Sequence, residues 1–265
     1  MNLIDEQIRS AASELGMKHL TDYWGSIAQK AAEEHSTYAD FLLEVLKSEV
    51  QYRASRTKEL YTKIAGFGTV KTLEEFDFKI ASGVPHKVIQ ELASLSLIDR
   101  KENIIFMGPS GTGKTHLAKA LGYKAVQAKL KTRFITASDL MLQLKTAKRQ
   151  EKLKSYMHRC ILNQKLIIID EIGYMPFGDE ESRLFFDVIA KRYETGSVIV
   201  TTNLSFGQWS KAFNNDNALT VALLDRLLHH SHIIQIKGDS YRLREKKMSG
   251  SVELFNLTGG SDLKG

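Results

Sequence analysis

The pattern of apolar and polar residues predicts helices at the start of the chain. Over residues 3–15 and 17–32 apolar side chains recur every three or four positions, which is the spacing of an amphipathic helix. A third helix is expected from Thr37, because Thr37 and Asp40 fit a capping box. We therefore predict a compact, all-helical N-terminal domain over residues 1–65.

Further along the chain, short apolar and β-branched runs alternate with helical segments. This alternation is typical of parallel strands that are covered by helices on both faces. The expected strands are residues 104–107, 133–136, 166–170, 197–201 and 232–236. The predicted fold class is α/β, with a parallel five-stranded sheet in a core of residues 85–248. Residues 66–84 are assigned to a linker, and residues 249–265, with a Gly-Gly pair and little periodicity, are expected to form a disordered tail.

The strongest chemical signal follows the first expected strand. Residues 108–115 read Gly-Pro-Ser-Gly-Thr-Gly-Lys-Thr, which fits the phosphate-binding pattern G-x-x-x-x-G-K-[ST], and an amphipathic segment follows. Glycines allow backbone N–H groups to close around phosphate oxygens, and a helix N-terminus adds positive potential. Lys114 is expected to reach the terminal phosphates of ATP, and Thr115 to ligate Mg²⁺. The expected nucleotide contacts are Gly108, Pro109, Ser110, Gly111, Thr112, Gly113, Lys114, Thr115 and His116.

A second motif places two carboxylates at the end of a buried strand. The run Leu166-Ile-Ile-Ile is followed by Asp170 and Glu171, and ligands of open α/β sheets bind at that edge. Asp170 is expected to be the second Mg²⁺ anchor, and Glu171 to orient and polarise an attacking water. The alternative is a strand that ends in two solvated carboxylates. Together with the phosphate-binding loop, the pair favours ATP hydrolysis over nucleotide binding alone.

Three later residues have both a functional and a plain interpretation. Asn203 follows the fourth expected strand, where its amide can help to place the water, or it forms a turn. Arg226 lies in an apolar helical stretch and is either a surface residue or an arginine finger for a neighbouring subunit's nucleotide. Arg242 follows the last strand and either faces its own subunit's nucleotide or is one residue of a basic run. The residues alone leave these alternatives open.

Positive charge is concentrated in one part of the chain. The net charge is +6, yet residues 124–165 alone hold 11 Lys and Arg against two acidic residues. Helical spacing there predicts that Leu140, Leu142 and Leu144 point inward and the cations outward. A soluble face usually mixes charges of both signs, so this one favours DNA phosphates over a merely solvated surface. The expected sequence-independent DNA contacts are Lys145, Lys148, Arg149, Lys152, Lys154 and Arg159.

Composition excludes several classes of protein. The single cysteine, Cys160, excludes an internal disulfide and suits a reducing cytoplasm. Residues 1–20 lack the features of a signal peptide, and apolar runs of four or five residues are too short to span a membrane. We therefore expect a cytoplasmic protein without a membrane partner.

The order of the motifs resembles that of the AAA+ superfamily. The segments 108–118, 170–174 and 224–231 are similar to those of IstB-like transposition helper ATPases, which belong to the clade of DnaC-like helicase loaders. The resemblance extends from residue 1 to about residue 247. It implies an AAA+ core after the helical domain, with the usual C-terminal helical lid reduced or absent.

The resemblance also implies roles and partners. Asn203 would be the first sensor, Arg226 the arginine finger in trans and Arg242 the second sensor, and these act with Lys114 and Glu171 in catalysis. The protein would form a homo-oligomer on duplex DNA with active sites shared between subunits. It would select target DNA and recruit and activate a partner transposase. The alternatives are a DnaC-like loader acting on single-stranded DNA and a replicative helicase, and an adaptor whose shape the nucleotide stabilises.

Overall fold

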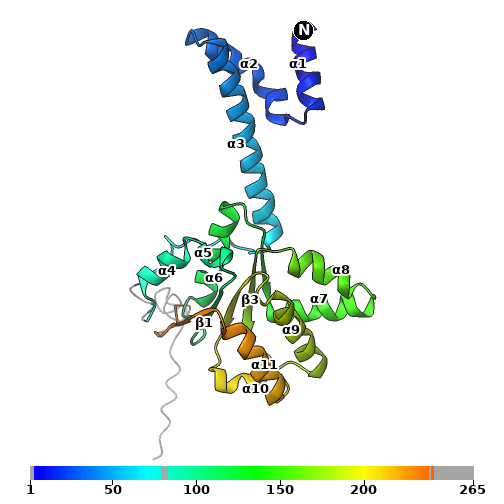
Figure 1. The fold of residues 1–265 in the computed structure, drawn as a ribbon. Helices are drawn as coiled ribbons and strands as arrows, with labels where there is room; N and C mark the ends of the chain where they lie inside the picture. The colour runs from blue at the N-terminus through cyan, green and yellow to red at the C-terminus, as the bar shows by residue number, and fades with distance from the viewer. Residues whose placement is uncertain (1–2, 79–80, 82, 239, 242–265) are drawn as a thin grey trace, which may run out of the picture. The chain divides into compact units, whose positions relative to one another are not determined.

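The computed structural model describes residues 3–78, 81, 83–238, 240 and 241. The chain divides into two compact units, Met1–Lys63 and Ile64–Gly265. In Figure 1 the first unit is helical, and the second has helices around a sheet. Within the described ranges, no helix combines the length and the apolar character needed to cross a membrane.

The first unit contains the three predicted helices. They are α1 (Leu3–Glu14), α2 (Lys18–Glu33) and α3 (Tyr38–Ala65). At the start of α3, the hydroxyl oxygen of Thr37 accepts a hydrogen bond from the backbone N–H of Asp40 at 3.2 Å. This contact is the N-terminal cap that the sequence predicts.

Glu49 of α3 completes the start of another helix. The residue preceding α2 makes no side-chain cap. Instead, Glu49 Oε2 accepts hydrogen bonds from the backbone N–H groups of His19 and Leu20 at 3.0 and 3.3 Å. Arg53 pairs with the same carboxylate at 2.8 Å. A buried carboxylate is thus satisfied by the unpaired N–H groups of a helix N-terminus.

The predicted compact core of this unit is smaller than the sequence pattern indicates. Its buried described residues are Ala12, Val45 and Glu49. Leu42 and Leu46 of α3 are apolar, yet they have exposed fractions of 56% and 47%. An apolar stripe becomes buried only where another element covers it, and three helices offer few such faces.

The second unit contains the parallel sheet, with strand order β2-β3-β4-β1-β5. Every neighbouring pair of strands is parallel, which confirms the predicted α/β class. The strands are β1 (Asn103–Met107), β2 (Thr132–Thr136), β3 (Leu166–Ile172), β4 (Ser197–Thr202) and β5 (Ser231–Gln235).

Helices cover both faces of this sheet. The main helices are α4 (His86–Leu92), α5 (Ser96–Asp99), α6 (Lys114–Gln127), α7 (Ala137–Arg149), α8 (Leu153–Tyr156), α9 (Asp179–Arg192), α10 (Trp209–Ala212) and α11 (Asn217–Leu228). A π-helical turn spans Met157–Leu162, and a 3-10 turn spans Phe206–Gln208. Ile167 and Ile169 of β3 belong to a core shared with α7, α9 and α11. Ile168, between them, contacts α6 on the other face, because Gly122 of that helix leaves room for it.

A buried arginine makes hydrogen bonds at the amino ends of β3 and β4, on the side of the sheet away from their carboxyl ends. Arg192, the last residue of α9, has an exposed fraction of 2%. Its guanidinium donates hydrogen bonds of 2.7–3.2 Å to the carbonyl oxygens of Ile161, Gln164, Lys165 and Ser197. Burial lowers the pKa of Arg192 to about 10. The side chain therefore ties the π-helical turn to the starts of β3 and β4.

Candidate nucleotide-binding site

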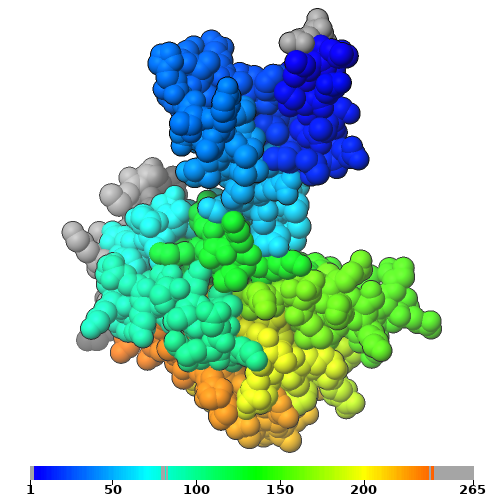
Figure 2. All heavy atoms as spheres, turned by 45° about the horizontal axis from the view of Figure 1, so that its top comes forward, coloured from blue at the N-terminus to red at the C-terminus, as the bar shows by residue number. Residues whose placement is uncertain are grey.

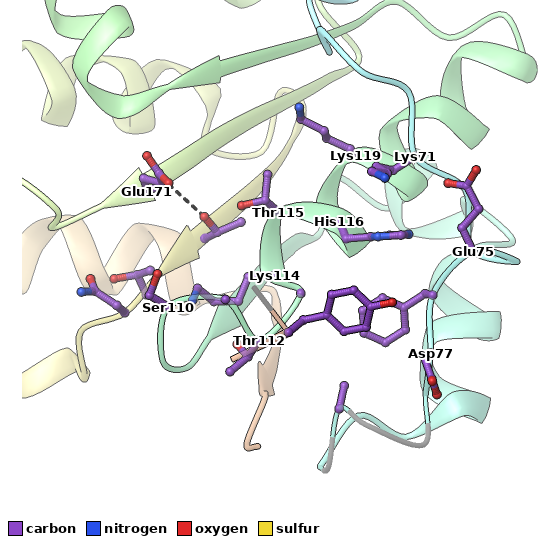
Figure 3. Close-up of a pocket in the computed structure, with 18 of the residues that line it drawn as sticks. Lys71, Glu75, Asp77, Ser110, Thr112, Lys114, Thr115, His116, Lys119 and Glu171 are labelled. Carbon is purple, nitrogen blue, oxygen red and sulfur yellow. Dashed lines mark hydrogen bonds between the residues drawn. The ribbon is translucent and has the colours of Figure 1, made fainter. Parts of the chain in front are cut away.

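A cavity of about 630 Å³ lies at the carboxyl ends of β3 and β4. Its described lining comes from residues 69–81, residues 110–119, the ends of these two strands, and residues 237–241. Figure 3 shows side chains from these segments pointing into the cavity. Of the expected nucleotide contacts, those that line it are Ser110, Gly111, Thr112, Gly113, Lys114, Thr115 and His116.

The loop before α6 requires glycine at two positions. A Cβ on Gly108 would lie 2.2 Å from the carbonyl oxygen of Ile236. Gly113 has φ of 95°, and a Cβ there would lie 2.6 Å from the ring of Phe76. A side chain at either position is therefore excluded, and the loop curls tightly into the start of α6. The N-terminus of α6 borders the cavity, as an anion site requires.

Lys114 and Thr115 are the first two residues of α6, and their side chains have different hydrogen-bond partners. The Nζ of Lys114 donates hydrogen bonds to the carbonyl oxygens of Gly108 and Pro109 at 2.7 and 2.6 Å. Gly108 and Pro109 themselves are not among the described residues that line the cavity. The Thr115 hydroxyl donates to the Asp170 carboxylate, at 2.9 Å to Oδ1 and 3.1 Å to Oδ2.

The Thr115 and Asp170 oxygens fit a magnesium ion. A hydroxyl and a carboxylate that lie side by side, next to a phosphate site, are the hard oxygen ligands that Mg²⁺ prefers. These two residues would hold the ion, and phosphate oxygens would supply further ligands.

Glu171 and Asn203 line the same cavity from neighbouring strands. Asp170 is buried, whereas Glu171 beside it is exposed to the cavity. Asn203 follows β4 and is also exposed there. The turn after β4 is closed by Thr202, whose hydroxyl accepts from the backbone N–H of Leu204 at 3.1 Å. The structure thus brings the two predicted water-placing side chains to one cavity.

Arg226 and Arg242 are the remaining predicted catalytic residues. Arg226 of α11 is not among the described residues that line the cavity. Its guanidinium donates to the carbonyl oxygen of Ala222 at 2.8 Å. Arg242, the predicted second sensor, lies outside the described residues, as do residues 249–265 of the predicted tail and any lid. The last described residue, Tyr241, lines the cavity, and its backbone N–H donates to Gly111 O at 2.9 Å.

Several cavity residues were not predicted from the sequence. Lys119 lines the cavity, and burial lowers its pKa. Its spacing of four residues from Thr115 on a helix is the signal that could have found it. Phe76 belongs to the segment assigned as a linker, yet it is buried and forms one wall. His116 holds that segment to α6, since its Nε2 lies 2.8 Å from Thr72 O.

Two lysines of the basic segment form ion pairs that the sequence did not predict. Lys145 pairs with Glu181 at 2.9 Å, and Lys148 pairs with Glu180 at 2.7 Å. Both carboxylates come from α9, more than 30 residues away in the chain. The expectation of an almost acid-free face is therefore wrong for these two lysines, because folding brings in acids that a local count cannot include.

Four of the six cations expected to contact DNA stay accessible without an ion pair in the described residues. Arg149, Lys152, Lys154 and Arg159 are exposed, and none forms an ion pair within the described part of the chain. In Figure 2 the light-green surface over α7 and α8 projects from the rest of the second unit. Leu142, expected to point inward, is 65% exposed on α7. The accessible surface therefore includes an apolar residue, Leu142, and an acidic one, Glu151, beside the cations.

Comparison with known families identifies the chain. A family model described as IstB-like ATP binding protein matches residues 10–249. The chain belongs to the IstB-like family. It is 43% identical over 250 residues to the ATP-binding protein of insertion sequence IS21 in Pseudomonas aeruginosa, which covers 94% of this chain and 93% of that protein. It is 40% identical over 243 residues to the ATP-binding protein of insertion sequence IS5376 in Geobacillus stearothermophilus, with 92% and 96% covered.

Solved structures show the fold of this IstB-like chain. A crystal structure of DnaI matches with a TM-score of 0.54 and 15% identity, covering 63% of this chain and 91% of that one. AMPPCP-bound DnaA from Aquifex aeolicus matches with a TM-score of 0.51 and 19% identity, covering 70% and 57%. The IstB-like chain therefore shares the fold of these structures, and its family is one of ATP-binding proteins.

Proposed function

We propose that this IstB-like chain hydrolyses ATP with Mg²⁺ and uses the reaction to control its assembly on duplex DNA. One observation carries the enzymatic part. The Thr115 hydroxyl lines the cavity together with Lys114 and Glu171, and it lies 2.9 Å from the buried Asp170 carboxylate. Phosphate, metal and water would thus each have a suitable partner in one site.

Each residue has a defined task in this mechanism. Lys114 would exchange its carbonyl partners for the terminal phosphates of ATP. Glu171 would accept a hydrogen bond from a water and orient it for in-line attack on the γ-phosphorus, with Asn203 as a second contact to that water. The P–O bond to ADP then breaks, and the water's proton leaves toward Glu171. When bound, Mg²⁺ supplies charge that neutralises the phosphate oxygens.

Assembly would complete the site. Arg226 lies outside its own subunit's cavity, so a direct contact with phosphate would have to be made in a neighbouring subunit. An arginine at the γ-phosphate stabilises charge in the transition state and raises turnover by about 10³–10⁵. Hydrolysis would then remove the γ-phosphate that joins the subunits, and so reset the assembly.

The accessible cations of α7, α8 and the π-helical turn support the DNA part of the proposal. Arg149, Lys152, Lys154 and Arg159 present positive charge without paired carboxylates, which suits phosphate contacts that do not depend on sequence. The described residues show no zinc-ligand pattern at this surface that would read bases.

The insertion sequences to which the relatives belong indicate the partner protein. The two relatives above are ATP-binding proteins of insertion sequences, and movement of such an element needs a transposase. We infer that this chain, once assembled, selects target DNA and recruits and activates that transposase.

Parallel measurements of ATP turnover and particle size test this function. Wild-type protein, Lys114→Ala and Glu171→Gln are each incubated with ATP and Mg²⁺ on duplex DNA, on single-stranded DNA and without DNA. We expect large ATP-dependent assemblies on duplex for wild type, none for Lys114→Ala, and long-lived assemblies without turnover for Glu171→Gln.

The other outcomes separate the alternatives. A strong preference for single-stranded DNA without growth of large assemblies would favour a helicase loader. A wild-type assembly lifetime for Glu171→Gln would favour an adaptor in which the nucleotide only stabilises a shape.

A further inference from the structure

The strand that carries the two carboxylates is irregular at their position. In the pairing of β3 with β4, Ile169 lies opposite Val200 and Ile172 lies opposite Thr202. Two residues of β3, Asp170 and Glu171, therefore stand against the single residue 201 of β4. One extra residue in a strand is a β-bulge, a device that re-aims side chains and is frequent beside active sites.

The bulge changes the direction of Glu171. Adjacent side chains of a regular strand point to opposite faces of the sheet. Glu171 instead has φ of 63°, in the left-handed region that residues other than glycine rarely adopt. Asp170 stays buried against Thr115, whereas Glu171 turns to the cavity. Such a conformation persists only where surrounding contacts stabilise it.

One hydroxyl makes those contacts. Thr201 is fully buried, with an exposed fraction of 0%. Its Oγ1 accepts a hydrogen bond from the backbone N–H of Glu171 at 2.9 Å, the dashed line in Figure 3. The same oxygen donates its proton to Asp170 Oδ1 at 2.5 Å. The bulge removes the strand-pairing partner of the Glu171 N–H, and the Thr201 side chain replaces it.

We propose that Thr201 is a positioning residue for ATP hydrolysis, which acts by holding both carboxylates at the bulge. It sets the backbone angle that directs Glu171 to the water. It also fixes Asp170, whose Oδ1 accepts hydrogen bonds from both Thr201 and Thr115, while Oδ2 lies 3.1 Å from the Thr115 hydroxyl. This role rests on the proposed ATPase function.

Neither a valine nor an alanine at position 201 can replace this hydroxyl. Valine has nearly the same shape as threonine but can neither donate to Asp170 nor accept from the Glu171 N–H. The bulge would then lose the contact that stabilises its left-handed residue. The phosphate loop, which Thr201 does not contact through a described hydrogen bond, would keep its geometry. The loss should therefore fall on the chemical step and not on nucleotide binding.

The experiment compares Thr201→Val, Thr201→Ser and Thr132→Val. Thr132 is a matched control, because it is a buried strand threonine whose hydroxyl donates to a carbonyl, that of Leu130 at 3.1 Å, away from the cavity. For each protein, kcat and KM for ATP on duplex DNA, the affinity for a non-hydrolysable ATP analogue and the unfolding midpoint are measured. Thr201→Ala is added in case the valine variant is unfolded at the assay temperature.

We expect Thr201→Val to lower kcat at least about tenfold, since small errors in the position of reacting groups carry losses of that order. The affinity for the ATP analogue should stay within about threefold of the wild-type value. Thr201→Ser, which keeps the hydroxyl, should restore most of kcat. Thr132→Val should keep wild-type kcat even where its unfolding midpoint falls.

Three results would overturn the positioning role. They are wild-type kcat in Thr201→Val or Thr201→Ala, a serine variant as slow as the valine variant, and a loss of analogue binding that matches the loss of kcat. Failure of the proposed function is distinguishable, because wild-type protein would then show no ATP turnover or Glu171→Gln would keep it. If Glu171→Gln abolishes turnover and Thr201→Val does not, only the role of Thr201 is lost.

Discussion

The guanidinium carbon of Arg226 lies 4.9 Å from the centre of the Phe186 ring, so that a cation of α11 rests on an aromatic face of α9. Such a contact contributes about 0.5–2 kcal/mol, depending on exposure. Together with the hydrogen bond to Ala222 O, it gives the proposed arginine finger a defined place within its own subunit. An arginine that is already ordered loses less side-chain entropy when it meets a phosphate.

The first prediction concerns subunits that share an active site. Arg226→Ala should lower turnover of the assembled protein by about 10³ or more, and Phe186→Leu should lower it several-fold by leaving the arginine less ordered. Neither change should alter the affinity of a single subunit for ATP, because both residues lie outside the cavity lining.

A mixing experiment provides the control. Arg226→Ala subunits keep an intact phosphate loop, and Lys114→Ala subunits keep the arginine. Each variant should be inactive alone, whereas an equimolar mixture should regain part of the wild-type turnover at interfaces that combine the two intact parts. A mixture as inactive as its components would show that Arg226 does not act in trans.

The second prediction compares the DNA binding of lysines with and without an ion pair on the basic segment. Lys152→Ala combined with Lys154→Ala should weaken duplex binding and reduce the slope of log affinity against log salt by about 1.8, because each phosphate contact contributes about 0.9. Lys145→Ala combined with Lys148→Ala is the matched control. It should change the slope less, since these lysines already pair with Glu181 and Glu180.

Fluorescence anisotropy with a labelled duplex at several salt concentrations measures both slopes. A larger effect of the Lys145 and Lys148 pair would show that DNA displaces the α9 carboxylates and that the contact surface extends along α7.

The third prediction concerns the buried guanidinium of Arg192. Arg192→Lys retains the charge but provides three N–H groups in place of the guanidinium fork, so some of the four carbonyl oxygens lose their donor. We expect the free energy of unfolding to fall by about 2–4 kcal/mol. Urea unfolding measures it, with Arg183→Lys on the exposed face of the same helix as the control. Equal stability of the two variants would show that the four hydrogen bonds of Arg192 do not stabilise the fold.

The fourth prediction is a pH dependence at the start of β1. Glu102 accepts hydrogen bonds from Arg100 at 2.7 Å and lies 2.8 Å from His232 of β5. The Arg100 hydrogen bond, followed by that of His232, lowers the pKa of Glu102 from 4.5 to about 2. Since the folded state has the lower pKa, this stabilisation is complete above the unfolded value and is lost as the pH falls from about 4.5 to about 2.

Glu102→Gln tests this sign. The variant should be less stable than wild type by about 1 kcal/mol at pH 7, a value typical of exposed ion pairs. The difference should shrink as the pH is lowered from about 4.5 toward about 2, where the wild-type carboxyl also becomes neutral. Urea unfolding at several pH values measures it, and a constant difference would show that the charge of Glu102 is not involved.

The short motifs of this chain could be predicted from the sequence without knowledge of the tertiary structure. The phosphate-binding loop, Asp170 and Glu171 could be assigned because each motif is a short run of sequence with a strand beside it, and the strand positions follow from apolar runs. The helical first unit was predictable for the same reason, since helix periodicity is a local property. Its thin core was not, because burial of Leu42 or Leu46 depends on which element covers them.

Tertiary structure decided the relationships between distant residues. Sequence alone determined the order of the motifs that contain Lys114, Thr115, Asp170 and Glu171, and this order is typical of an IstB-like ATP-binding protein. Only the fold brought Glu180 and Glu181 to the basic segment, and only strand pairing set Thr201 against the bulge. The physical reason is that hydrogen bonds and ion pairs act over about 3 Å in space, whereas a sequence pattern records only separation along the chain.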